Sequence, residues 1–299
     1  MNNKMLAALT GAVTLATTCI NAHADENLFG YVKGAEVLPQ GAIEGYQWFT
    51  QRSDKGQGHY RALDTLTELE YGVTNRFQVS AELGGMSIDT SGLVIDGYLP
   101  MDKKTSWRPR SIEFGLKYNF LSPAKDDFGL SATTTFEYAW IDKHSGQDKR
   151  EYEIETQLQA QKYFMEGQLV WVGNIGLRAA WEKRGTIDNL PPGFDWPTDP
   201  EMELTPTIGT GVTYRFAPGW FIGGELQHET EYETEVSIER RTLFGGPTLH
   251  YASDKWWATL TYFKQLWGSG EKYAGQTDDY LHLIEKTKKE IRLKLGYNF

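Results

Sequence analysis

Apolar and polar residues alternate along most of this chain, which is the pattern of a β-strand with one apolar and one polar face. In the C-terminal segment, one face holds Ile291, Leu293, Leu295, Tyr297 and Phe299. The same alternation predicts strands over 112–120, 128–140, 169–182 and 203–216, and weaker alternation predicts them over 41–52, 60–72, 76–88, 150–163, 219–235, 239–252 and 255–267. The sequence therefore predicts twelve strands.

The connections between these strands alternate between short turns, such as 72–76 and 166–167, and longer loops, such as 90–109 and 185–200. This is typical of an up-and-down barrel with short periplasmic turns and long outer loops. Unpaired backbone groups are costly in hydrocarbon, so a sheet in a membrane must close. We therefore predict an all-β fold, a closed antiparallel transmembrane β-barrel of about 12 strands over residues 41–299. A secreted antiparallel sandwich is the alternative.

The first 24 residues have the features of a secretory signal peptide. Lys4 precedes an apolar run from Met5 to Ile20, and Ala22-His23-Ala24 is a small-x-small cleavage site. Cys19 lacks the preceding residues typical of a lipoprotein signal, so lipidation is disfavoured. Residues 25–40, between this signal and the first strand, are predicted to be an N-terminal periplasmic segment. They are expected to line the periplasmic mouth, plug the lumen or extend the first strand.

Charge and composition exclude several classes of protein. After removal of the signal, 29 Lys and Arg face 40 Asp and Glu, so nucleic acid is not an expected partner. Beyond the signal, no apolar stretch approaches the roughly 20 residues of a membrane helix. The 16 Tyr, 14 Phe and ten Trp are numerous for a hydrophilic chain, and barrels place such residues at both membrane interfaces.

Two segments resemble known proteins. The run Leu293-Lys294-Leu295-Gly296-Tyr297-Asn298-Phe299 resembles the C-terminal assembly signal of Gram-negative outer-membrane β-barrels. That resemblance implies the outer membrane as location and recognition of Phe299 by the barrel assembly machinery, with membrane lipid and lipopolysaccharide as surroundings. Residues 26–41, with Glu44-Gly45-Tyr46, are similar to the mature N-terminus of a proteobacterial outer-membrane family known only as a domain of unknown function.

Candidate functional residues lie on the face predicted to line the lumen. An acidic row contains Glu225, Glu229 and Glu231, and the last predicted strand carries Lys286, Lys288, Arg292 and Lys294 on its inward face. In an open lumen, separated rows of opposite charge would orient polar solutes. In the alternative interpretation, which we favour, inward charges neutralise one another in ion pairs with neighbours such as Arg178, Arg215 and Arg240.

The sequence shows no pattern typical of a metal site or of an outer-membrane hydrolase. The five histidines beyond the signal show no metal-ligand spacing and are interpreted as scattered and solvated, so no metal or cofactor is predicted. No Ser-His block typical of outer-membrane hydrolases occurs, and no catalytic residue is proposed. The apolar residues of the 90–109 loop predict that it folds inward or packs across the mouth, and 185–200 is a second candidate lid.

The leading hypothesis is a passive channel or transport protein for small polar or amphipathic solutes. The alternatives are a barrel enzyme hydrolysing lipid or peptide and a structural or adhesion barrel. An open lumen is expected for the channel. A sealed lumen is expected for the alternatives, with a Ser-His or Asp-His cluster at the rim for the enzyme and without such a cluster for the structural or adhesion barrel.

Overall fold

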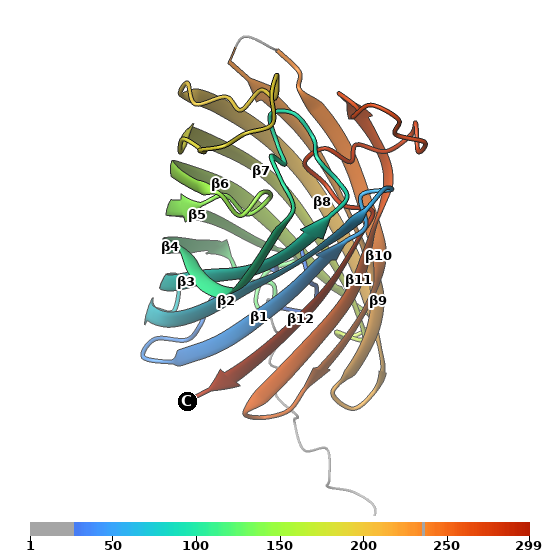
Figure 1. Cartoon of the computed structure of the whole chain (residues 1–299). Helices are drawn as coiled ribbons and strands as arrows, with labels where there is room; N and C mark the ends of the chain where they lie inside the picture. The colour runs from blue at the N-terminus through green and yellow to red at the C-terminus, as the bar shows by residue number, and fades with distance from the viewer. Residues whose placement is uncertain (1–26, 235–236) are drawn as a thin grey trace, which may run out of the picture.

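The computed structural model describes residues 27–234 and 237–299. Twelve antiparallel strands form one closed barrel there, so the predicted fold class and strand number are confirmed (Figure 1). The strands are β1 (Ile43–Ser53), β2 (His59–Thr74), β3 (Phe77–Ser91), β4 (Lys103–Leu121), β5 (Gly129–Ile141), β6 (Asp148–Phe164), β7 (Leu169–Arg184), β8 (Glu201–Ala217), β9 (Trp220–Glu233), β10 (Arg240–Ala252), β11 (Trp256–Gly270) and β12 (Lys289–Asn298). Among the described residues, no helix is long and apolar enough to cross a membrane. The predicted signal peptide, residues 1–24, lies outside them.

The barrel closes where the first strand meets the last. β1 pairs with β12 in an unbroken antiparallel register from Glu44 opposite Asn298 to Ser53 opposite Lys289. Every other strand pairs with its two neighbours in sequence, so no strand edge is left open. This satisfies the backbone hydrogen bonds that lipid cannot provide.

The outer face of the barrel is apolar over its whole circumference. Large side chains such as Ile175 and Ile208 are 63% and 60% exposed, although they lie in the middle of strands. Exposed tryptophans gather near the strand ends, with Trp220 and Trp256 at one end of the barrel and Trp107 and Trp267 near the other. An apolar band with aromatic residues at both rims is the surface that a bilayer requires.

The two ends of the barrel differ. The turn end carries the five short connections between β2 and β11 together with the start of β1 and the C-terminus, which is marked in Figure 1. The loop end carries the six remaining connections. This agrees with the predicted alternation of short and long connections.

Two connections at the loop end differ from their predicted lengths. The loop after β3 covers only 92–102, because Lys103–Pro109 pair with β3 across register shifts at Gly84/Gly85 and Met86/Ile88. The last loop is longer and covers 271–288. The prediction that Lys286 and Lys288 lie on the final strand is therefore wrong, because the preceding residues Leu281 to Ile284 turn inward and are buried.

We expect a charge on the outer face to destabilise the barrel. Replacing Ile208 with Arg would place a guanidinium against hydrocarbon near the middle of β8, at a cost of about 2–4 kcal/mol in the free energy of unfolding. Denaturant unfolding of the protein in lipid vesicles measures this cost. The matched control is Val94→Arg, because Val94 is 51% exposed on the 92–102 loop. Equal effects of the two substitutions would contradict a lipid-facing role for Ile208.

Candidate functional site

A polar cavity of about 410 Å³ lies inside the barrel, between two closures. Residues 27–40, here called the plug, occupy the lumen at the turn end. The loops 54–58, 92–102, 142–147 and 271–288, here called the lid, pack together at the loop end. The cavity wall includes Tyr31 and Lys33 of the plug and His144 and Glu285 of the lid. The plug and the lid therefore obstruct the lumen at its two ends, whereas an open lumen was expected for a channel.

The plug has no strand or helix of its own, and barrel side chains satisfy its backbone. Glu225 of β9, which is 2% exposed, accepts hydrogen bonds from the backbone N–H groups of Gly30, Tyr31 and Val32 at 2.8, 2.8 and 3.0 Å. The hydroxyl of Thr261 donates to the same carboxylate at 2.9 Å. Charge-assisted bonds of this kind are among the strongest in proteins. Glu225 is therefore the main anchor of the plug.

Amide side chains on the inner wall hold the next residues of the plug. Asn174 accepts from the N–H of Lys33 at 2.7 Å and donates to the carbonyl of the same residue at 2.8 Å. The side chain of Gln161 accepts from the N–H of Ala35, and Asn119 donates to its carbonyl, at 2.7 and 2.8 Å. These contacts replace the sheet pairing that the segment lacks.

Apolar side chains of the plug also pack against the inner wall of the barrel. Leu28, Phe29 and Val32 form a buried apolar cluster with Val170 and Val172 of β7. Gly209 and Gly211 of β8 face this cluster, and a Cβ atom at these two positions would lie 2.7 Å from Val32 and 2.5 Å from the Phe29 ring. Only glycine leaves room for the plug at these positions.

An apolar cluster holds the lid together. Its members come from two of the lid loops, 92–102 and 271–288, and from the adjoining ends of β2, β3 and β5: Tyr60, Ala62, Met86, Ile88, Leu93, Ile95, Leu99, Ile141, Tyr273, Leu281, Leu283 and Ile284. The fully buried ammonium of Lys55 donates to the carbonyls of Leu283 and Ile284 at 3.0 and 2.6 Å. The prediction that apolar residues of the 92–102 loop pack across the mouth is confirmed. The 185–200 loop contacts this loop through the Asp195 carbonyl, which accepts from the N–H of Gly97 at 2.8 Å.

The histidines were predicted to be solvated, and for three of them this is wrong. His144, His250 and His282 are buried, because the 142–147 and 271–288 loops fold inward and β10 turns His250 toward the plug. Burial lowers the pKa of His144 and His282, which keeps both rings neutral under the lid. Burial and the nearby charge of Glu285 raise the pKa of Glu239, at the rim, to about 10.

The five predicted lumen residues fall into two groups rather than one site. Three hold the plug. Besides Glu225, Arg292 donates to the Gly30 carbonyl at 2.9 Å and lies 3.9 Å from the centre of the Tyr31 ring, and Lys294 donates to Asn27 at 2.5 Å.

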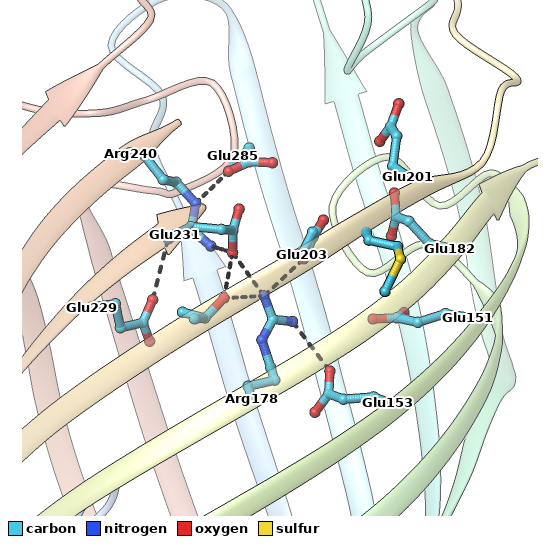
Figure 2. Close-up of polar contacts among 12 residues, drawn as sticks. Glu151, Glu153, Arg178, Glu182, Glu201, Glu203, Glu229, Glu231, Arg240 and Glu285 are labelled. Carbon is cyan, nitrogen blue, oxygen red and sulfur yellow. Dashed lines mark hydrogen bonds and ion pairs between the residues drawn. The ribbon is translucent and has the colours of Figure 1, made fainter. Parts of the chain in front are cut away.

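The other two, Glu229 and Glu231, belong to an ion-pair network near the loop end (Figure 2). Arg178 bridges Glu153, Glu203 and Glu231 at 3.1, 2.9 and 2.7 Å. Arg240 pairs with Glu229, Glu231 and Glu285, and Lys286 pairs with Glu229 at 2.7 Å. Two of the three predicted partners, Arg178 and Arg240, thus neutralise inward glutamates.

Glu231, Glu239 and Glu285 place one oxygen each within 4.8 Å of one another, which is a spacing suited to a metal ion. Arg240 already pairs with Glu231 and Glu285, and the hydroxyl of Tyr98 donates to Glu239 at 2.7 Å. These contacts account for the cluster without a metal.

A row of glutamates crosses the inner wall at right angles to the strands. Direct cross-strand register places Glu68 opposite Glu82, Glu82 opposite Glu113, Glu113 opposite Glu137, and Glu137 opposite Glu153. We call these five residues, on β2 to β6, the acidic belt. Like charges in directly opposed positions destabilise a sheet unless cations compensate them. Alternation alone does not give register, so the sequence did not predict Glu113 and Glu137 as members of this belt.

The cations that compensate the belt come from two sources. Arg110 pairs with Glu137 at 3.1 Å and Arg178 with Glu153 at 3.1 Å, so strand residues neutralise one end. At the other end, Lys33 of the plug lines the main cavity together with Glu82 and Glu113, and a small pocket together with Glu68. The plug therefore brings a cation to this end of the belt.

We expect loss of the Glu225 carboxylate to release the plug. In Glu225→Ala, the three plug N–H groups lose their acceptor, and each unsatisfied buried group costs about 1–3 kcal/mol. Thiol labelling of Ala35→Cys, a position with no exposure in the plug, reports release as faster modification. Glu166→Ala, at an exposed turn of the same end, is the control. Equal protection in both backgrounds would show that Glu225 is not the anchor.

Comparisons with known proteins agree with this architecture. A family model described as "Family of unknown function (DUF6662)" matches residues 21–299. A search of curated proteins found no match to the sequence.

Several solved structures share the fold at low sequence identity. The COG4313 outer membrane channel from Pseudomonas putida F1 is 14% identical, with 89% of this chain and 98% of that chain covered and a TM-score of 0.56. The β domain of the Bordetella autotransporter BrkA is 12% identical, with 87% and 100% covered and a TM-score of 0.52. The translocator domain of the autotransporter NalP from Neisseria meningitidis is 11% identical, with 86% and 88% covered and a TM-score of 0.50.

Proposed function

We propose that this chain, which belongs to the DUF6662 family of unknown function, is a gated outer-membrane channel for small polar solutes, and that the structure is its closed state. The turn end would face the periplasm and the loop end the exterior. Proteins of similar fold include a channel and autotransporter domains, so the fold does not decide the function. The proposal therefore depends on the lumen.

The observation that carries the proposal is the charged cavity between the plug and the lid. Thirteen carboxylates and nine Lys or Arg side chains line it, which is a costly way to fill a barrel that has only a structural role. Neither closure is part of the sheet. The plug and the lid can therefore move while the barrel stays intact, and their displacement would join the cavity to both sides of the membrane.

The alternatives explain less. An enzyme acting on lipid or peptide would place a nucleophile within reach of a base at the rim. Among the described residues there, the Ser145 hydroxyl donates to Asp142 at 2.9 Å, and no serine hydroxyl is hydrogen-bonded to the His144 ring. An adhesion barrel would depend on its outer loops, yet four of these loops turn inward to form the lid. A channel accounts for the loops, the plug and the cavity together.

Conductance in planar bilayers tests the proposal. We expect the full chain to be mostly closed, and Glu225→Ala or Leu99→Asp alone to change little, because one closure persists in each. Leu99 is 1% exposed within the lid cluster, so a carboxylate there would disrupt the lid. The double variant is expected to show discrete openings, whereas Glu166→Ala with Val94→Asp serves as the control. A folded double variant that stays silent would refute a channel.

The ion selectivity of the open double variant gives an independent check. Carboxylates outnumber cations around the cavity, so we expect a preference for cations in a KCl gradient. Replacing Glu113 and Glu155 with Gln should shift the reversal potential toward zero. Asp127→Asn, at an exposed turn, should leave it unchanged. Anion preference, or no response to the Glu113 and Glu155 substitutions, would show that the cavity charge does not act on permeating ions.

A further inference from the structure

Three neighbouring glutamates of the acidic belt lie beside a lysine of the plug. Glu68, Glu82 and Glu113 lie side by side on β2, β3 and β4. Lys33 shares a small pocket with Glu68 and Glu82 and lines the main cavity with Glu82 and Glu113. Displacement of the plug would therefore leave these three carboxylates together without a cation from residue 33.

A second observation indicates that this end of the belt is built to receive a ligand. Glu68 is only 2% exposed, and among the described residues no N–H or hydroxyl donor lies within hydrogen-bond distance of its Oε2 atom. A buried carboxylate oxygen without a donor raises the free energy of the folded protein. A ligand that brings a donor or a cation to this oxygen would remove that cost. Glu68 therefore offers an acceptor to a ligand in the pocket that it lines together with Lys33.

The surroundings favour an organic cation over a metal ion. Trp48 already attracts cations: Lys33 Nζ and Lys294 Nζ lie 5.9 and 4.4 Å from the centre of its ring, and Arg292 Cζ lies 5.1 Å from it, within the range of cation–π contacts. An aromatic face attracts an alkylammonium group and accommodates its methylene stem, but it supplies no oxygen ligand to a metal. The Lys33 side chain, four methylenes ending in an ammonium, has the shape of such a ligand.

We propose that Glu68, Glu82 and Glu113, with Trp48, form a binding site for an organic cation bearing a primary ammonium group, and that Lys33 is its tethered occupant in the closed state. This inference rests on the proposed channel function and names the class of its solute. A solute with this group competes with Lys33 for the same carboxylates. Binding of the solute would then favour release of the plug.

Chemical rescue tests the site in the full-length, folded protein. Lys33→Ala removes the Lys33 ammonium, and n-butylamine, protonated at neutral pH, reproduces the side chain that was removed. We expect n-butylammonium to raise the thermal unfolding temperature of Lys33→Ala as its concentration increases. Calorimetry should show that Lys33→Ala binds n-butylammonium about tenfold or more tightly than the wild type does, because Lys33 competes for the site in the wild type. Lys33→Arg keeps the site occupied and should behave as the wild type.

Three controls decide the interpretation. n-Butanol has the same stem without the charge and should not rescue Lys33→Ala. Adding Glu68→Gln and Glu82→Gln to Lys33→Ala should abolish rescue, whereas adding Asp127→Asn should not. Mg²⁺ should not substitute for the amine. Rescue by n-butanol, equal rescue by Mg²⁺, or rescue that survives loss of Glu68 and Glu82 would each overturn the proposal.

The outcome is separable from that of the channel experiment, because stability and binding are measured without conductance. Rescue of Lys33→Ala alongside a silent double variant would leave the ammonium site standing and reject the channel. Openings of the double variant without rescue would leave the channel standing and reject the ammonium site.

Discussion

Pairing between β1 and β12 is the constraint on which the rest of the structure depends. It removes the last open edge, so the whole backbone of the barrel is satisfied and its outer face can be apolar. Strand alternation then turns every second residue inward, and in this chain most of those residues are polar or charged. Closing the sheet therefore confines many polar groups in a narrow lumen, where each must find a partner.

The lumen meets that requirement in different ways along its length. Toward the loop end, Arg178 and Arg240 link glutamates from several strands, and the wall neutralises itself. Toward the turn end, the wall is rich in amides and depends on the backbone of the plug for its hydrogen bonds. The two closures consequently differ in kind: the plug is held mainly by hydrogen bonds and charge, and the lid mainly by apolar contact.

Much of the barrel could be predicted because alternation is a local property of the sequence. It gave the strand number, the outward residues and the inward side chains of Glu225, Glu229, Glu231, Arg292 and Lys294. It did not give the partners of these residues, because partners depend on register between strands. Glu113 and Glu137 each occur once on a strand and become part of a belt only through pairing.

The plug was harder to recognise because it has no periodicity. The wall residues that contact the plug can be noticed in the sequence. They are amides such as Gln161 and Asn174 on the inner face, and the glycines at 209 and 211. The buried histidines could not be predicted from spacing, since their burial results from loops that fold back over the lumen.

The position of the plug at the start of the chain has a consequence for the order of folding. Its contacts join residues far apart in sequence, 195 positions for Gly30 and Glu225 and 267 for Asn27 and Lys294. A segment that precedes the whole barrel in sequence thus waits for the last strand before it can dock fully. Once β1 pairs with β12, only a short tether separates residue 40 from the sheet, and docking becomes an intramolecular step at an effective concentration on the order of millimolar. A separate peptide would have to exceed that concentration to take the place of the plug, so reclosure is governed by the chain itself.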